Sequence, residues 1–227
     1  MQEFLRLASG KNTVTKKIEP FPNLSAGGAE LAAKLPQDLF REVVVLAIVS
    51  AGVPGAVEVA KHLGAPLDLI ISRRLLAPRG PGSQAMAVNI AGTLVVDEEI
   101  GSRPAKPQTP FDYFREDVLN ELEQRAKVCR GERPPVDLAG RKLLIVDCGI
   151  RTGLTMQAAL GAARRLKPAH ITAAVPVTSA EGRQIAETLA DEFIYLAAPE
   201  PFGNAGVWYK DFSRLADDRI SEVLIPG

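Results

Sequence analysis

Continuous runs of aliphatic and β-branched residues recur along the chain, and they predict strands that are buried on both faces of a parallel sheet. These runs are VVVLAIV at 43–49, PLDLIIS at 66–72, KLLIVD at 142–147, HITAAVPV at 170–177 and DEFIYLA at 191–197. Segments with apolar residues every three or four positions predict helices between them, at 56–64, 111–130, 154–166 and 179–190. Because strands and helices alternate, the predicted fold class is α/β, Rossmann-like, with a mostly parallel sheet flanked by helices.

Other segments of the chain carry turn signals or weaker patterns. The basic stretch RRLLAPRGPGSQ at 73–84 is rich in Gly and Pro and predicts a loop. AMAVNIAGTLVV at 85–96 predicts a hairpin that turns at Ala91-Gly92. We expect one domain over 1–227, with a core at 42–197.

Composition narrows the classes of function. The 227 residues carry 27 Lys+Arg and 27 Asp+Glu, and a formal net charge of zero disfavours nucleic acid as the main partner. Cys129 and Cys148 form no CxxC pair and the chain has only two histidines, which disfavours a disulfide framework or a zinc site. The first residues show no signal-peptide pattern, and no apolar run approaches the roughly 20 residues of a membrane span. We therefore expect a cytoplasmic protein without a membrane partner.

The turn after the strand at 142–147 carries the strongest candidate chemistry. It holds Asp147 at the strand end, then Gly149, Thr152, Gly153 and Thr155, and it opens directly into a helix. Backbone N–H groups at a helix start bind phosphate well, and an acid beside them can hold sugar hydroxyls. The alternative is an ordinary turn whose polar groups satisfy only the local backbone. The GxxxxGK[ST] and GxGxxG phosphate motifs do not occur.

LLIVDCGIRTGLT at 143–155 resembles the phosphoribosyl pyrophosphate motif of type I phosphoribosyltransferases, which has four apolar residues, two acids and a loop ending in T-G-x-T. Three stretches resemble one phosphoribosyltransferase-like branch of that superfamily: GVPGAVEVAKHLGAPLDLIISRRLLAP, LNELEQRAKVCRGERPPVDLAGRKLLIVD, and DEFIYLAAPEPFGNAGVWYKDFSRLADDRISEVL. The similarity spans about residues 43–224. It implies the phosphoribosyltransferase fold, with a small hood from residues 1–41 and 198–227 that selects the acceptor.

The resemblance also implies roles for individual residues. Asp147 and the position of Cys148 would contact the ribose hydroxyls. The loop around the 5′-phosphate would contain Gly149, Ile150, Arg151, Thr152, Gly153 and Thr155. The turn that binds pyrophosphate would contain Ser50, Ala51, Gly52 and Val53. Arg73, Arg74 and Arg79 would belong to a mobile cover, and catalysis would rest on Asp147, Arg73 and Arg74.

The implied reaction transfers the phosphoribosyl group of phosphoribosyl pyrophosphate to a nucleobase-like acceptor. The implied cofactor is Mg²⁺, held through the substrate near Asp147 with no direct side-chain ligation, and the implied assembly is a homodimer. Three residues depart from the family pattern: Cys148 replaces the second acid, Arg151 stands where a small or acidic residue is common, and Ser50 stands where close relatives often have a basic residue. The alternative is therefore a non-catalytic phosphoribosyl- or nucleotide-binding regulatory protein. A hydrolase is disfavoured because no Ser/His/Asp set is visible.

Two further interpretations concern side chains near the implied site. Cys148 is either a reactive thiol at a helix start or a small buried core residue, and we expect the second. Phe202, Trp208, Tyr209 and Phe212 either stack on a base or pack against the sheet, and we again expect the second.

Overall fold

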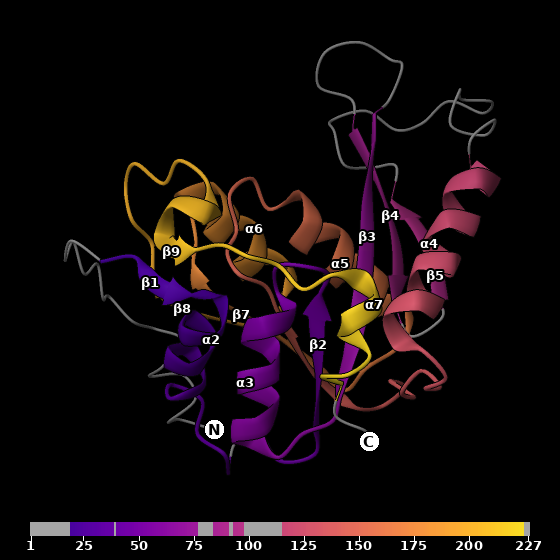
Figure 1. Ribbon diagram of the computed structural model, residues 1–227, viewed down its shortest axis with the longest axis horizontal. Coiled ribbons are helices and arrows are strands. Elements are labelled where there is room, and N and C mark those ends of the chain that lie inside the picture. The colour runs from indigo at the N-terminus through magenta and orange to yellow at the C-terminus, as the bar shows by residue number, and fades with distance from the viewer. Residues whose placement is uncertain (1–18, 39, 77–83, 91–92, 98–114, 225–227) are drawn as a thin grey trace.

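The computed structural model describes residues 19–38, 40–76, 84–90, 93–97 and 115–224. Its centre is a seven-stranded sheet with the strand order β5-β4-β3-β2-β6-β7-β8 (Figure 1). The strands are β2 (Val43–Ile48), β3 (Leu67–Leu76), β4 (Gln84–Ile90), β5 (Thr93–Asp97), β6 (Lys142–Val146), β7 (His170–Val177) and β8 (Glu192–Ala197). The pairs among β3, β2, β6, β7 and β8 are parallel, and β4 and β5 add an antiparallel hairpin. This confirms the predicted α/β class and the mostly parallel sheet.

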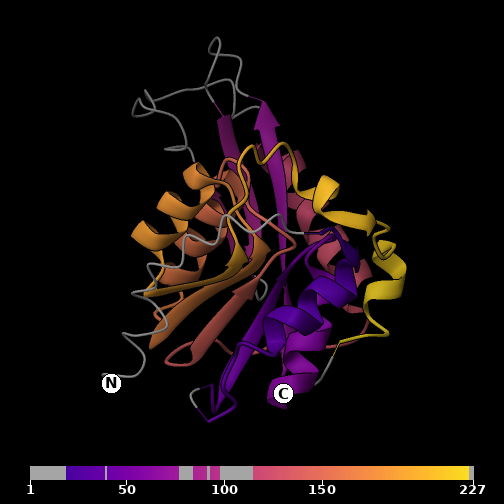
Figure 2. The same cartoon turned by 90° about the vertical axis from the view of Figure 1, so that its left-hand side faces the viewer.

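Helices cover both faces of the sheet, which explains the continuous apolar runs. One face carries α2 (Leu24–Ala32), α3 (Val53–Leu63), α4 (Arg115–Arg130) and α7 (Asp217–Ile220). The other face carries α5 (Leu154–Arg165) and α6 (Ala180–Leu189), so that Figure 2 shows the sheet between two helical layers. Along β2, Val45 and Ala47 point to the first layer, whereas Val44 and Leu46 point to the second. Successive side chains of a strand alternate between faces, so every position of β2 is buried.

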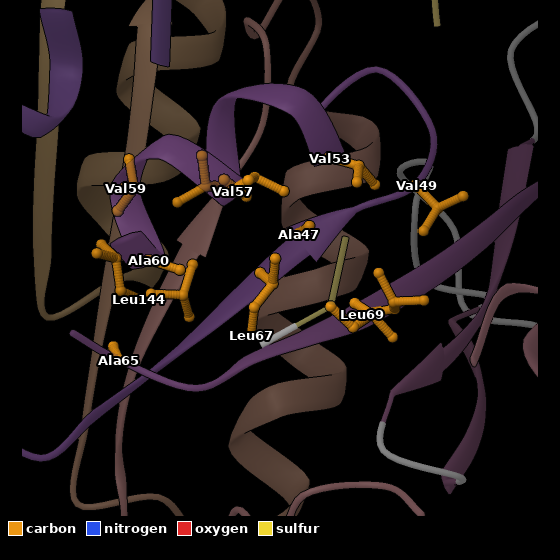
Figure 3. Close-up of a cluster of buried hydrophobic side chains, with 14 of the residues drawn as sticks. Ala47, Val49, Val53, Val57, Val59, Ala60, Ala65, Leu67, Leu69 and Leu144 are labelled. Atoms are coloured by element: carbon orange, nitrogen blue, oxygen red, sulfur yellow. The ribbon is translucent and has the colours of Figure 1, made fainter. Parts of the chain in front are cut away.

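Helix α3 is positioned by packing on the strands that flank it. Figure 3 shows Val53, Val57 and Ala60 of this helix facing Ala47 and Leu69 in one apolar cluster. The helix begins three residues earlier than the pattern predicts, because Pro54 suits its first turn. It ends as predicted at Gly64, whose φ of +61° is a left-handed conformation that favours glycine.

The predicted loop at 73–84 is wrong at its start. Strand β3 continues to Leu76, and Arg73 and Arg74 lie opposite Ala87 and Met86 of β4. The Gly and Pro residues suggested a loop, but pairing with the antiparallel strand β4 extends β3 into the first residues of this stretch. Residues 77–83 and the predicted hairpin turn at Ala91-Gly92 lie outside the described residues.

The two terminal segments meet beside the main sheet. Strand β1 (Phe21–Asn23) pairs in parallel with β9 (Tyr209–Asp211), which follows the 3-10 helix η1 (Ala205–Trp208). Helix α2 then crosses α3 at a close contact, where a Cβ added to Gly28 would lie 2.2 Å from Gly55 Cα. The two terminal segments also pack on the last residues of β7 and β8, since Phe21 and Tyr209 share a buried cluster with Val177 and Ala197. The division into a core and a hood selecting the acceptor stays a prediction. Within the described ranges no helix is long and apolar enough to cross a membrane.

A buried ion pair ties α4 to β3 at the opposite end of the sheet. Arg130 Nε donates to Asp68 Oδ1 at 2.8 Å, and both side chains are almost fully buried. Asp68 also accepts from the backbone N–H groups of Leu69 and Val136, at 2.7 and 3.0 Å. All of these donors satisfy one carboxylate, so removing the guanidinium leaves a buried charge poorly compensated.

We expect Arg130→Leu to lower the free energy of unfolding by about 3–5 kcal/mol, because Asp68 loses its charged partner in the interior. Chemical denaturation measures the loss. Arg219→Leu is the control, since its ion pair with Glu222 has side chains 65% and 53% exposed and should contribute at most about 1 kcal/mol. Equal losses in the two variants would contradict the assigned role of the buried pair.

Candidate functional site

The turns that follow β2 and β6 touch at the carboxyl edge of the sheet. The chain leaves β2 toward β3 on one side, whereas β6 lies on the other side of β2. Ligands of open parallel sheets bind at such a switch point. Gly52 makes the contact, because a Cβ there would lie 2.8 Å from Val146 O and 3.1 Å from Asp147 Cα. The structure therefore brings together the predicted pyrophosphate turn at 50–53 and the predicted ribose residue Asp147.

The first turn is closed by its own backbone. Gly52 N–H donates to Ile48 O at 3.0 Å, and Val53 N–H donates to Ser50 O at 3.3 Å. Val53 is the first residue of α3 rather than a turn residue. Ala51 packs against the aromatic residues of the terminal segments. The turn thus lies between the sheet and the two terminal segments.

The loop at 149–153 is built against β7 and α6. Ile150 forms a bridge with Thr178, with its N–H donating to Val177 O at 3.1 Å. Ser179 N–H donates to Ile150 O at 2.8 Å, and its hydroxyl donates to Arg151 O. Gly153 has a φ of +76°, and a Cβ there would lie 2.6 Å from the Ile185 side chain. Glycine is required at this position both by conformation and by space.

The backbone of residues 151–155 offers unused donors at the start of α5. Within the part of the chain that the structure describes, no hydrogen bond uses an N–H group of these five residues. The hydroxyls of Thr152 and Thr155 likewise have no partner among the described residues, and both side chains are half-buried. The positive end of the helix dipole points at the same place. These groups form a cradle suited to an oxyanion such as phosphate.

Asp147 supplies one carboxylate beside this cradle. Its Oδ1 accepts a hydrogen bond from Cys148 N–H at 2.7 Å. Burial raises the pKa of Asp147 from 3.8 to about 6, against the lowering effects of the Cys148 hydrogen bonds and of the charge on Arg214. Asp147 is therefore a carboxylate that gains a proton in weakly acidic solution.

Cys148 lies in an apolar cluster and not in the cradle. Its side chain is buried with Phe21, Phe202 and Tyr209, and the Tyr209 hydroxyl donates to Cys148 O at 2.5 Å. Burial, with the charge of Asp147, holds the pKa of the Cys148 thiol well above its ordinary value. The structure thus favours the interpretation of Cys148 as a core residue over that of a reactive thiol.

The aromatic residues of the C-terminal segment pack mainly on one another. Phe202 and Tyr209 are buried, and the ring centroids of Phe202 and Trp208 are 6.3 Å apart. Trp208 Nε1 donates to Phe202 O at 3.0 Å. This confirms the packing interpretation for Phe202 and Tyr209, whereas Trp208 and Phe212 keep partly exposed rings.

The arginines predicted to cover the site are not all placed there. Arg73 lies on β3 with an exposed side chain that forms an ion pair with Glu121 of α4. The backbone of Arg74 is in β3, and Arg79 lies outside the described residues. Arg151 is exposed on the loop at 149–153.

Sequence reasoning missed Arg214, and it named Tyr209 only as an aromatic residue that stacks or packs, without its hydrogen bond at the site. Arg214 lies close enough to Asp147 and Cys148 for its charge to lower the pKa of both groups. Tyr209 joins the C-terminal segment to the strand end through the Cys148 carbonyl. Their only signal in the sequence is the segment WYKDFSRL itself, which shows aromatic residues beside a basic one but not where they pack.

The family resemblance implies Mg²⁺, so the side chains at the site can be compared with the ligands that this ion needs. Among the described residues no group of three or more His, Cys, Asp or Glu side chains could hold a metal ion. Asp147 is the one carboxylate that the two turns bring to the cradle. A cation that arrives with an anionic substrate fits this single carboxylate better than one held by protein side chains alone.

We expect Gly52→Ala to lower the free energy of unfolding by about 2 kcal/mol or more, because its Cβ would lie 2.6 Å from Ile48 O and 2.8 Å from Val146 O. Chemical denaturation measures this change. Gly55→Ala, in the first turn of α3, is the matched control, because a Cβ there would meet atoms only at 3.4 Å or beyond. This substitution should change stability by less than about 1 kcal/mol. A Gly52→Ala variant as stable as Gly55→Ala would show that the two turns do not press on each other.

We expect Asp147→Asn to stabilise the protein at neutral pH and not at pH 4. The raised pKa means that the folded state disfavours the carboxylate, so the wild-type chain loses stability as the pH rises from about 4 to about 6. The full difference corresponds to about 3 kcal/mol above pH 7. Asn keeps an oxygen that can accept from Cys148 N–H. Burial holds the pKa of Cys148 and that of Tyr209 above their ordinary values, so both groups stay neutral in this window.

Urea denaturation of both chains between pH 4 and pH 8 measures the difference. A constant difference across this range, or a less stable variant at pH 8, would contradict a carboxyl with a pKa of about 6.

Comparisons with known proteins agree on one family. The family model described as phosphoribosyl transferase domain matches residues 14–196. Two curated relatives, from Mycobacterium tuberculosis strains CDC 1551 / Oshkosh and ATCC 25618 / H37Rv, are each 34% identical over 204 residues and carry the name "Putative phosphoribosyl transferase". The match covers 90% of this chain and 46% of each relative, so the chain spans about half the length of these relatives.

A solved structure shows the same fold. The protein TT1426 from Thermus thermophilus is 29% identical and superposes with a TM-score of 0.73, over 90% of this chain and 97% of that one. The family match includes both turns and the strands that carry them. The chain therefore belongs to the phosphoribosyl transferase domain family.

Proposed function

We propose that this chain binds phosphoribosyl pyrophosphate and transfers its phosphoribosyl group to a nucleobase-like acceptor. The observation that carries the proposal is the contact of two strand-end turns at the switch point, one with unused backbone donors next to Asp147 and the other pressed against that residue. A phosphorylated ribose has a phosphate for the donors and hydroxyls for the carboxylate, at opposite ends of one sugar. The family membership supports the same substrate class.

Each part of the site has a distinct role in this proposal. The N–H groups of residues 151–155 and the hydroxyls of Thr152 and Thr155 bind the 5′-phosphate. Asp147 accepts hydrogen bonds from the ribose hydroxyls, which orients the anomeric carbon. The turn Ser50-Ala51-Gly52 lies beside Asp147 and holds the pyrophosphate. Mg²⁺, when it is bound with the substrate, neutralises charge on the leaving pyrophosphate.

The transfer breaks the bond between the anomeric carbon and the pyrophosphate oxygen and forms a bond from that carbon to the acceptor nitrogen. Pyrophosphate leaves with the bonding electron pair, and the acceptor loses its N–H proton to water. The protein contributes mainly by orienting the sugar and stabilising the charge of the leaving group.

A second candidate function, binding without turnover, is favoured by one observation. Cys148 occupies the place of the second acid in the motif, and its side chain is buried among aromatic rings. A neutral thiol in that position gives the ribose little hydrogen bonding. A regulatory protein that binds phosphoribosyl pyrophosphate or a nucleotide would keep the cradle and lack transfer.

Turnover separates the two functions. The measurement incubates the chain with Mg²⁺-phosphoribosyl pyrophosphate and a panel of purine and pyrimidine bases, and it follows release of pyrophosphate. Release that depends on one acceptor supports transfer, whereas tight binding without release supports the regulatory candidate. Absence of both binding and release would contradict the proposed substrate.

We expect Thr155→Val to weaken the binding of ribose 5-phosphate about 10- to 100-fold, because a hydrogen bond to a charged phosphate is worth about 1.5–3 kcal/mol. Valine keeps the shape of threonine, so the fold should be unchanged. Calorimetry with ribose 5-phosphate measures the affinity. Thr188→Val is the matched control, because Thr188 is an exposed residue of α6 and its hydroxyl donates to Gln184 O at 2.7 Å. Equal affinity in the two variants would place the phosphate elsewhere.

A further inference from the structure

The C-terminal segment crosses the carboxyl edge of the sheet as a strap, defined here as residues 209–220. Figure 1 shows it running from β9 on the hood side to α7 beside α4. At its start, β9 pairs with β1. At its end, Asp217 accepts two hydrogen bonds from Arg125 of α4, at 2.7 and 3.0 Å. Both ends are anchored, so the residues between them have a defined place over the sheet edge.

Two apolar side chains fix the middle of the strap. Phe212 packs in the cluster that contains Cys148 and Ala51, with its ring centroid 5.6 Å from that of Tyr209. Leu215 packs against the cluster under α3 and α4. The strap thus passes from one cluster to the other, and the first of these clusters contains Ala51 and Cys148 of the two site turns. Arg214 is the charged residue between these two anchors.

Arg214 is an exposed residue whose guanidinium packs on the Phe212 ring. Its Cζ lies 5.2 Å from the centroid of the Phe212 ring, a cation–π distance. Phe212 contacts the cluster of Ala51, which belongs to the predicted pyrophosphate turn. Among the described residues no salt bridge involves Arg214, whereas the nearby Arg219 is paired with Glu222. The lowering effect of the Arg214 charge on the pKa of Asp147 supports the same placement.

The site otherwise lacks a fixed cation on the side of the 50–53 turn, as far as the described residues show. The first residue of that turn is Ser50, a neutral residue, and Arg73 is paired with Glu121 of α4. Pyrophosphate carries several negative charges, and a planar guanidinium with five donors suits its oxygens. Arg214 is the arginine of the strap, and its charge lowers the pKa of Asp147 and Cys148 beside that turn.

We propose that Arg214 binds the pyrophosphate end of the ligand and supplies part of the positive charge that Mg²⁺ would otherwise provide. This inference rests on the proposed function. When two cations neutralise the same anion, each contributes less to the binding free energy than it would alone. Removing Arg214 should therefore matter most when Mg²⁺ is absent. A purely structural role of Arg214 in holding the strap would weaken binding equally with and without the metal.

Calorimetry with inorganic pyrophosphate and with phosphoribosyl pyrophosphate, each in Mg²⁺ and in a chelator, tests the inference. We expect Arg214→Gln to weaken both ligands about 10- to 100-fold in the chelator and by a clearly smaller factor in Mg²⁺. Binding of ribose 5-phosphate, which lacks the pyrophosphate, should stay within about threefold of the natural chain. Arg214→Lys should recover part of the lost affinity because it keeps the charge. Arg219→Gln is the control and should leave all three ligands unchanged.

The outcomes separate this inference from the proposed function. If the natural chain binds neither ribose 5-phosphate nor phosphoribosyl pyrophosphate, the proposed function and the inference are both wrong. If the natural chain binds both and Arg214→Gln binds pyrophosphate as well as it does, only the inference is wrong. Equal losses with and without Mg²⁺, or an equal loss for ribose 5-phosphate, also overturn it, because they assign Arg214 to the fold. Thermal melting of each variant shows that the compared chains are folded.

Discussion

The close approach of Gly52 to the end of β6 is the constraint on which the site depends. Backbone oxygens of Ile48 and Val146 leave no room for a Cβ at this position, so the turn after β2 lies directly against Asp147. The strand order makes this contact available, because β2 and β6 are neighbours although about 95 residues separate them in the chain. Because Gly52 has no side chain, the turn after β2 and the turn after β6 can lie against each other.

The charges at this edge are few and are unevenly buried. The pKa of Asp147 is raised, because burial disfavours its charged form more than the nearby hydrogen bonds favour it. The carbonyl oxygen of Cys148 accepts a hydrogen bond from the Tyr209 hydroxyl, and its side chain packs in the cluster that contains Phe21, Phe202 and Tyr209. Cys148 therefore joins the terminal segments to the sheet, and the presence of cysteine in place of an acid is also a packing change. A site with one carboxylate and a nearby arginine carries a more positive balance than the two-acid motif that it resembles.

The parts of the fold that sequence reasoning predicted are those governed by local pattern. The strands at 43–49, 142–147 and 170–177 each show an apolar run, and each is buried on both faces. Gly64 and Gly153 mark a helix end and a helix start through their left-handed backbone. Arg73 and Arg74 were misplaced in a loop because the pairing of β3 with β4 depends on a partner that the local composition does not reveal. Residues 149–155 are contiguous in the loop and the first turn of α5, and their binding of a phosphate stays a prediction.

The sequence by itself determined the α/β class, the βα turn with its unused donors, and the family, because each of these is written in a short contiguous segment. Only the tertiary structure decided that Gly52 presses on Asp147, that Cys148 faces aromatic rings rather than the cradle, and that Arg214 packs on Phe212 within range of its charge acting on Asp147. These contacts join segments that are far apart in the chain. Which distant segments meet depends on strand order and on the packing of whole side chains, and neither quantity is encoded in a local pattern.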